Sequence, residues 1–366
     1  MRLTALALGT LLCLHVMSAQ AQELFDKETF AHPADVQDTV FGFGNGSTVV
    51  APIPLSNPTV GSGLILGAGY LFNVDSKSDT SFFGLGALRT DNGTEGYALA
   101  GNFAMRENRL KFGFAAGAVN AFYPLYVGGV PVQINQSGEL IQANFAYGFT
   151  PDFAAGLHMR YIDTTISPKG IGSLPLDVVP DTNLGIFNIG LTADYDTRDD
   201  TIFANNGFHV AAKTSHGFIN GDSRTYDKVT LVFDYFTPAP KKDDVFAFRV
   251  AGCSASDSAP FYDACAIGGD DAFRGYPSTQ FIDNNRLSVQ AEYRGKLSDR
   301  FGYALFGGVG VVGENGSELL DDDLKSAVGL GLRFRLSKQF PLDFAIDAAV
   351  NRDGEQSTYV YVGQRF

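Results

Sequence analysis

Apolar and polar side chains alternate one by one along most of the chain beyond residue 47. The alternation is clearest in the segments 187–196, 287–294, 328–336 and 342–350. In segment 287–294, one face holds Leu287, Val289, Ala291 and Tyr293, and the other holds Ser288, Gln290, Glu292 and Arg294. A period of two is typical of a β-strand whose two faces meet different surroundings. The pattern therefore predicts an all-β protein.

The same alternation would suit either a soluble β-sandwich or a membrane-spanning β-barrel. The alternating segments run for roughly 10–13 residues, as tilted spanning strands require, whereas soluble strands average about 5–6 residues. The polar faces of neighbouring segments also carry charges of opposite sign, which suits a water-filled lumen. We therefore favour a transmembrane antiparallel β-barrel over a sandwich.

Counting back from the C-terminus, the pattern predicts fifteen strands. They lie near 355–366, 341–350, 323–336, 300–312, 284–295, 243–254, 223–237, 205–217, 182–196, 152–163, 138–149, 109–121, 95–106, 80–90 and 61–73. A barrel with both termini on one side needs an even number, so we expect about 16 strands, the first near Ser47–Ser56. Pro52 and Pro54 lie in that strand, and both lack a backbone donor on the same side. They predict a weak seam between the first and last strands.

The connections between these strands fall into two groups. Short turns at 106–109, 151, 237–243, 296–299 and 337–341 lie on one side, and longer connections at 122–137, 164–181, 255–283 and 313–322 lie on the other. Outer-membrane barrels have short periplasmic turns and long external loops. This asymmetry places the loop 255–283 on the external side.

The start of the chain resembles a secretory signal peptide. Arg2 precedes an apolar run from Leu3 to Met17, and Ala19-Gln20-Ala21 forms a small-x-small cleavage site. We expect a signal peptide at 1–21, a short periplasmic segment at 22–46 and the barrel at 47–366. No later segment has the pattern of a spanning helix, but a closed barrel can enter the membrane because closure pairs every backbone group.

Composition and charge exclude several classes of protein. Aromatic residues make up 13% of the chain, charged residues only 18%, and the formal net charge is −13. A disordered chain or a coiled coil would have more charge and fewer aromatic residues. A nucleic-acid-binding protein would need a basic face. These numbers agree with a barrel whose outer surface contacts outer-membrane lipid.

Cys253 and Cys265 are the two cysteines outside the signal peptide, and they lie near the start of the long external loop. In an oxidising compartment we expect a disulfide worth about 2–3 kcal/mol through the entropy of the closed loop, with two free thiols as the alternative.

The sequence contains no motif for a catalytic or cofactor site. His158 and His209 fall on lumen faces without an identifiable catalytic partner, and a triad needs three groups within hydrogen-bond reach. The run Asp321-Asp322-Asp323 is typical of a solvated loop, although such a run could also bind a divalent cation. We therefore predict a protein that is not an enzyme and has no metal and no cofactor.

Three stretches of the sequence resemble the BamA/TamA (bacterial surface antigen) barrel superfamily. The stretch IGGDDAFRGYPSTQFIDNNRLSVQAEYRGKL is similar to the sixth external loop of that family and its following x-E-x-R strand. The stretch YDTRDDTIFANNGFHV resembles its D-x-R periplasmic turn, here Asp196, Arg198, Asp199 and Gly207. The ending YVYVGQRF is similar to the C-terminal assembly signal, which places Phe366 in that role.

The resemblance implies that the loop folds into the lumen, with Arg274, Gly275 and Tyr276 at its tip. Arg274 would then meet Glu292 on the next strand. The family usually has a second carboxylate in an F-x-D-x-G pattern, but here that position is Gly308. The resemblance therefore predicts that Glu292 carries most of the attraction on Arg274.

The resemblance also bears on function. Members that insert or translocate proteins have periplasmic repeat domains, whereas the segment Gln22–Gly46 is too short for one. Three hypotheses remain open. They are assembly or translocation of outer-membrane or surface proteins, passive passage of small solutes, and a lumenal enzyme, which no motif in the sequence supports. The barrel assembly machinery would be a partner during biogenesis, and the client stays unknown.

Overall fold

The computed structural model describes residues 46–366 except 76, 80, 170–181, 202, 242, 261–262, 269–272, 317–318, 320–322 and 338–341. The predicted signal peptide and residues 22–45 lie outside the described residues, as do Asp321 and Asp322. Among the described residues, no helical segment has the length and hydropathy that a membrane span requires.

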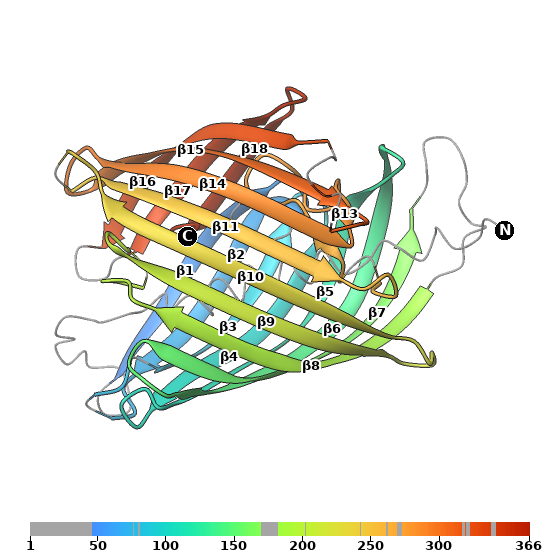
Figure 1. Ribbon diagram of the computed structural model, residues 1–366, viewed down its shortest axis with the longest axis horizontal. Helices are drawn as coiled ribbons and strands as arrows, with labels where there is room; N and C mark the ends of the chain where they lie inside the picture. The colour runs from blue at the N-terminus through green and yellow to red at the C-terminus, as the bar shows by residue number, and fades with distance from the viewer. Residues whose placement is uncertain are drawn as a thin grey trace.

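Sixteen long strands close into one antiparallel barrel, in which β1 and β18 meet (Figure 1). The barrel strands are β1 (Gly46–Asn57), β2 (Gly61–Phe72), β3 (Ser81–Thr90), β4 (Glu95–Met105), β5 (Leu110–Val127), β6 (Val130–Gly148), β7 (Phe153–Pro168), β8 (Thr182–Asp196), β9 (Gly207–Ile219), β10 (Thr225–Pro238), β11 (Val245–Ala255), β14 (Asn285–Lys296), β15 (Phe301–Gly313), β16 (Lys325–Ser337), β17 (Leu342–Asn351) and β18 (Gln356–Val362). The two-residue strands β12 (Cys265–Ala266) and β13 (Ile282–Asp283) pair with each other within the long loop. The predicted sixteen-stranded barrel is confirmed, including the proline-containing first strand.

The barrel has two different ends. We call the loop end the one that carries the connections 58–60, 91–94, 128–129, 220–224, 256–284 and 352–355. We call the turn end the one that carries 73–80, 106–109, 149–152, 197–206, 239–244 and 297–300. Figure 1 shows β13 at the loop end and the C-terminus toward the turn end. The loop end corresponds to the predicted external side.

The segment 122–137 is not the external loop that the sequence pattern predicted. Strands β5 and β6 run through it as one long hairpin, which turns at Gly128 and Gly129. Both glycines have positive φ angles, 58° and 80°, which residues with a Cβ rarely adopt. The hairpin extends beyond the length that a membrane span needs, because it also packs against the interior at the loop end.

The outward face of the barrel is apolar, as the alternation predicts. Leucines on five strands expose 46–58% of their surface outward, namely Leu64, Leu85, Leu231, Leu305 and Leu330. A soluble protein would bury such residues, whereas a spanning barrel turns them toward lipid.

The interior at the loop end is packed with apolar side chains, which the prediction of a wet lumen did not anticipate. Residues from eight wall strands and the β1–β2 turn form this loop-end core: Leu55, Val60, Leu88, Val119, Ala121, Tyr123, Leu125, Val132, Ile134, Leu140, Ile162, Ile166, Ile186, Ile219 and Tyr226. Ala259 and Ile282 of the long loop pack against this core. The loop therefore lies inside the barrel and shares a core with its wall.

Candidate functional site

Arg274, near the tip of the long loop, is buried in the lumen between two carboxylates. Its guanidinium donates through Nη2 to Glu292 on β14 and through Nη1 to Asp347 on β17. The Arg274 side chain is 2% exposed, and both carboxylate side chains are 0% exposed. The guanidinium also lies over the Phe306 ring, 3.5 Å from its centre, as in a cation–π contact.

This geometry corrects the expectation that Glu292 carries most of the attraction. Gly308 does lack a carboxylate, but Asp347 supplies one from two strands farther along the wall. Glycines on the intervening strand β16 make room for it, because a Cβ at Gly331 would lie 1.9 Å from Asp347 Oδ1 and one at Gly329 would lie 2.3 Å from the Phe306 ring. Because the side chains of Arg274, Glu292 and Asp347 are only 0–2% exposed, lumen water does not screen these ion pairs.

Further cations complete the network around these two carboxylates. Arg294 Nε donates to Glu292 Oε1 at 2.8 Å, and Arg333 Nη1 donates to Asp347 Oδ1 at 2.5 Å. The Tyr361 hydroxyl of β18 donates to Asp347 Oδ2 at 2.7 Å. The network therefore joins the loop tip to strands β14, β16, β17 and β18.

The two residues after Arg274 also bind the wall. Gly275 has a φ of +118°, its N–H donates to the Tyr359 hydroxyl at 2.8 Å, and its carbonyl accepts from Asn351 Nδ2 at 3.1 Å. The Tyr276 hydroxyl donates to the Ser326 carbonyl at 3.0 Å. A Cβ at position 275 would lie 2.5 Å from the Ala327 Cβ, so only glycine fits this close approach.

The β1–β18 contact is the weakest junction of the barrel wall. It contains one register pair, Ser56 with Val360, whereas the β1–β2 ladder runs unbroken from residue 46 to residue 57. Pro52 and Pro54 lie opposite Leu66 and Leu64 in that unbroken ladder. Because the β1–β2 ladder is complete, we infer that the missing proline donors are on the β18 side.

The long loop contacts both sides of this seam. On the β1 side, Ser278 N donates to Thr59 Oγ1 at 3.2 Å, and the two hydroxyl oxygens lie 3.1 Å apart. On the β18 side, Gly275 contacts the hydroxyl of Tyr359. The loop thus bridges the two strand edges at the loop end.

The C-terminus leaves the wall instead of completing a strand to residue 366. Strand β18 ends at Val362, and Gly363 has a φ of +98°. Phe366 is 5% exposed and packs against a cluster formed by Ala204, Phe236, Val245 and Ala247. The Arg249 guanidinium lies 5.0 Å from the centre of its ring. The prediction that Phe366 is an assembly signal is not tested by this placement.

The structure joins Cys253 at the end of β11 to Cys265 of β12 by a disulfide. Two residues before Cys265, Asp263 accepts hydrogen bonds from Arg160 on β7 and from Tyr226 and Lys228 on β10, the strand next to β11. The sequence did not predict a role for Asp263. The loop has no regular alternation and contains several aspartates, so no pattern distinguishes this one from the others.

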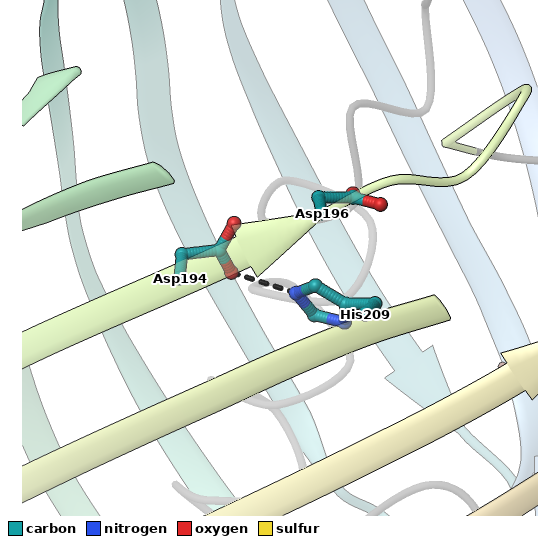
Figure 2. A group of neighbouring side chains, drawn as sticks. All are labelled: Asp194, Asp196 and His209. Atoms are coloured by element: carbon teal, nitrogen blue, oxygen red, sulfur yellow. Dashed lines mark hydrogen bonds and ion pairs between the residues drawn. The ribbon is translucent and has the colours of Figure 1, made fainter. Parts of the chain in front are cut away.

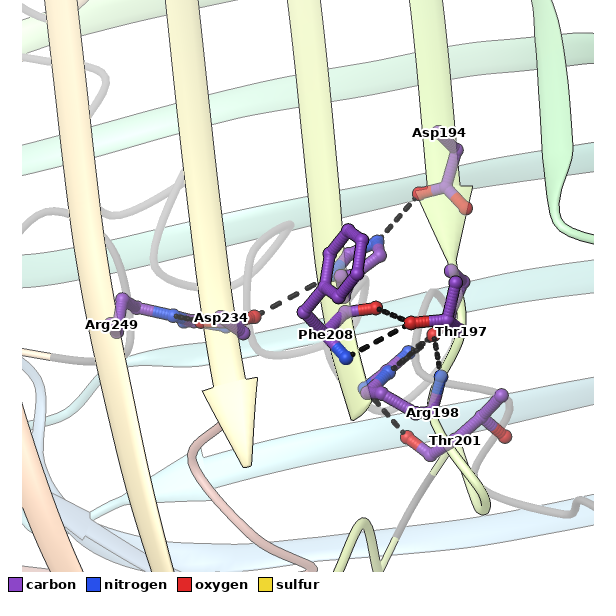
Figure 3. A network of polar contacts seen from close by, with 9 residues as sticks. Asp194, Thr197, Arg198, Thr201, Phe208, Asp234 and Arg249 are labelled. Atoms are coloured by element: carbon purple, nitrogen blue, oxygen red, sulfur yellow. Dashed lines mark hydrogen bonds and ion pairs between the residues drawn. The ribbon is translucent and has the colours of Figure 1, made fainter. Parts of the chain in front are cut away.

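A row of alternating charges crosses the wall near the turn end. Asp196, His209, Asp234 and Arg249 are successive register partners on strands β8 to β11. His209 Nε2 lies 2.6 Å from Asp194 Oδ2 (Figure 2), and Arg249 Nε donates to Asp234 at 2.5 Å (Figure 3).

The carboxylates Asp194 and Asp196, together with His209, lie close enough to hold a metal ion. However, Arg198 binds Asp196 at 2.5 Å and His209 lies between Asp194 and Asp234, so protein groups already satisfy these charges. We therefore interpret the group as a charge ladder that braces the wall.

The D-x-R turn named by sequence resemblance is tightly bonded. Arg198 Nη1 donates to the Thr201 carbonyl at 3.0 Å, as Figure 3 shows, and Asp199 accepts from the backbone of Asn205 and Asn206. Gly207 has a φ of +110°, and a Cβ there would lie 2.4 Å from the Thr197 carbonyl oxygen.

His158, the other lumen histidine, lies 2.6 Å from the carbonyl of Thr214.

Solved structures share this barrel. The structure "BamA from Haemophilus ducreyi lacking POTRA domains 1-3" has a TM-score of 0.59 at 13% identity, covering 95% of this chain and 78% of that one. CdiB from Acinetobacter baumannii has a TM-score of 0.58 at 12% identity, covering 93% and 67%. CdiB from Escherichia coli has a TM-score of 0.56 at 12% identity, covering 89% and 64%.

Comparison with curated protein sequences finds no match. The family model described as the Omp85 superfamily domain matches residues 129–366, which include the long loop, Arg274 and the C-terminus. The chain belongs to the Omp85 superfamily.

Proposed function

We propose that this barrel assists the insertion or translocation of outer-membrane or surface proteins through the seam between β1 and β18. Membership of the Omp85 superfamily and the likeness to BamA and CdiB structures support a barrel of the assembly or translocation type in the bacterial outer membrane. The observation that carries the proposal is the single register pair across the seam.

The physical basis of the proposal is that the β1–β18 junction has one register pair, whereas the other junctions of the wall have long ladders. A net backbone hydrogen bond is worth about 0.5–1.5 kcal/mol, so a seam with few of them opens at lower cost than a full ladder. Unpaired edges in lipid are unfavourable, and an incoming client strand would pair with them. The loop contacts at Thr59 and Tyr359 would keep the edges together until a client arrives.

The second candidate is a passive channel for small solutes. The buried loop and the loop-end core argue against this role, because their side chains occupy the interior at the loop end, through which a solute would have to pass. An enzymatic role has no support, since Omp85 superfamily members are non-enzymatic transporters and assembly factors.

We further propose that residues 1–21 are a signal peptide that is cleaved off, and that residues 22–46 form a short periplasmic segment before the barrel at 47–366. Outer-membrane lipid would surround its apolar outer face. The barrel assembly machinery would insert it during biogenesis, and the ending that includes Phe366 would serve as the signal. The chemistry of the client is open.

Hydrogen exchange tests the seam without a known client. In detergent, amides of β1 and β18 should exchange faster than those of β15 and β16, which pair over ten positions from Phe301 to Gly310. Equal protection of the two junctions would refute a weak seam.

Cross-linking then tests its use. Cysteines at register partners Ser56 and Val360 should lock the seam and change the protein composition of the outer membrane in cells. The matched control is a pair at Leu305 and Leu330, which are register partners on β15 and β16 and should have no effect. If both pairs, or neither, alter the membrane, the proposed route through the seam is wrong.

A further inference from the structure

Asp263 of the long loop lies in a pocket of the wall that converges on its carboxylate. Arg160 Nη2 and the Tyr226 hydroxyl each donate to Asp263 Oδ2 at 2.5 Å, and Lys228 Nζ donates to Oδ1 at 3.2 Å. Asn188 Nδ2 lies 3.4 Å from Oδ2. The Asp263 side chain is 2% exposed, so its carboxylate is buried among these donors.

The four groups belong to the wall, and hydrogen bonds join three of them to one another. Arg160, Asn188 and Tyr226 lie in one register row that crosses β7, β8, β9 and β10 through Gly217. Arg160 Nη2 donates to Asn188 Oδ1 at 2.9 Å, and Asn188 Nδ2 donates to the Tyr226 hydroxyl at 2.8 Å. Gly217 permits this contact, because a Cβ there would lie 2.2 Å from the Tyr226 ring. The pocket is therefore preorganised on rigid strands.

The charge of the pocket defines what it can bind. It holds two cations, Arg160 and Lys228, and two neutral donors, Asn188 and Tyr226. The two neutral residues are 0% and 1% exposed, respectively. Cations in such a site are costly without an anion, and a planar carboxylate matches donors that approach both of its oxygens. The loop supplies that carboxylate through Asp263.

We propose that this pocket is a carboxylate receptor, that Asp263 occupies it as a built-in ligand, and that it binds a carboxylate of another molecule when the loop withdraws. The Cys253–Cys265 disulfide ties the loop to β11 only two residues from Asp263. This tether gives Asp263 a high effective concentration, so a free acid competes poorly in the resting protein. The receptor does not depend on the assembly role, because it follows from the wall residues alone.

The test uses Asp263→Asn in the full barrel, which removes the built-in charge and preserves the shape of the side chain. The readout is the midpoint of heat-modifiable migration on gels with increasing succinate, at ionic strength held constant with chloride. Succinate should raise the midpoint in Asp263→Asn with half-saturation at a concentration about tenfold or more below that needed by the wild type. The matched control is Asp257→Asn in the same loop, whose carboxylate accepts from Asn284 and should give the wild-type response.

Adding Arg160→Gln to Asp263→Asn should abolish the succinate effect. The receptor is refuted if neither succinate nor a tetra-aspartate peptide has an effect on Asp263→Asn beyond that of chloride, or if the effect survives Arg160→Gln. A tetra-aspartate peptide forms a second arm. If only the peptide acts, the ligand is an acidic polypeptide, and if succinate acts as well, a small acid suffices.

A second variant covers the case in which Asp263→Asn does not fold. Cys253→Ser with Cys265→Ser keeps Asp263 but frees its tether. Succinate should then displace Asp263 and increase chymotrypsin cleavage between residues 253 and 268 in the double variant but not in the wild type. Unchanged cleavage with saturating succinate would overturn the proposal independently of the seam experiments.

Discussion

Substitution of Asp347 tests whether two carboxylates, rather than Glu292 alone, hold the loop tip in the lumen. Asp347→Asn keeps the shape of the side chain and removes its charge. Arg274 then retains only Glu292, because its second charged hydrogen bond is lost. A hydrogen bond to a charged group contributes about 1.5–3 kcal/mol, and the 0–2% exposure of these side chains gives no reason to lower that value.

Limited chymotrypsin digestion measures this free energy, because cleavage follows the population of the open loop when opening is fast. The cleavage sites Phe273 and Tyr276 are 3% and 1% exposed in the closed loop. Since each 1.4 kcal/mol is a factor of ten, Asp347→Asn should raise the cleavage rate about 10- to 100-fold. Glu292→Gln should have a similar effect.

Arg274→Ala should raise cleavage more than either single change, because it removes both bonds at once. Adding Asp347→Asn to Arg274→Ala should then have no further effect on loop cleavage, as expected of residues that interact directly. Asp343→Asn is the matched control, since Asp343 lies on the same strand and pairs with Arg335 instead of the loop. If Asp347→Asn leaves cleavage unchanged and Glu292→Gln matches Arg274→Ala, Glu292 holds the tip alone.

Three further predictions concern other parts of the chain. Hydrogen bonds from the Ser78 hydroxyl and from backbone N–H groups lower the pKa of Asp75, between β2 and β3, to about 2. A depressed pKa stabilises the fold above pH 3.8 and loses that effect as the pH falls toward 2, so amide protection in this turn should drop over that window and should not do so in Asp75→Asn. Replacing Cys253 and Cys265 with serine should destabilise the barrel by about 2–3 kcal/mol, measured by urea-induced unfolding. Gly308→Asp, which restores the family's carboxylate, should increase loop cleavage, because a Cβ at Gly308 would lie 2.8 Å from Gln290 and 3.2 Å from the Phe273 ring; reduced cleavage would contradict this packing.

The positions of the strands could be predicted because alternation is a local property of the sequence. The segment 122–127 was missed because apolar residues occupy both of its faces. Ala121, Tyr123 and Leu125 are buried in the loop-end core, while the residues between them are also apolar. In 130–137 Val132, Ile134 and Gln136 are buried, while Gln133 and Ser137 are exposed, so apolar side chains face inward here. Beyond the membrane-spanning part of the barrel, the outer face contacts water and the inner face is packed with apolar side chains. The pattern of a spanning strand, apolar outside and polar inside, therefore no longer applies.

The partners of the loop could be predicted only in part. Glu292 follows the loop directly in sequence, and the family resemblance supplied its pairing with Arg274. Asp343 and Asp347 lie four residues apart on one strand and therefore on the same face, so the alternation predicts that both point into the lumen. Which lumen carboxylate reaches the loop tip depends on the stagger and tilt of strands far apart in sequence, and no local pattern contains that information.

The contacts of the long loop imply that release of the loop and opening of the seam are coupled. Thr59 lies beside β1 and Tyr359 lies on β18, and both bind the same short stretch of loop from residue 275 to residue 278. Moving either strand edge must therefore break a contact of the loop tip, and withdrawing the tip removes a bridge between the edges. Because the free-energy coupling between two such events is reciprocal, substitutions that free the tip should also speed hydrogen exchange in β1 and β18. Exchange at the seam that is the same in Arg274→Ala and in the wild type would show that the loop and the seam open independently.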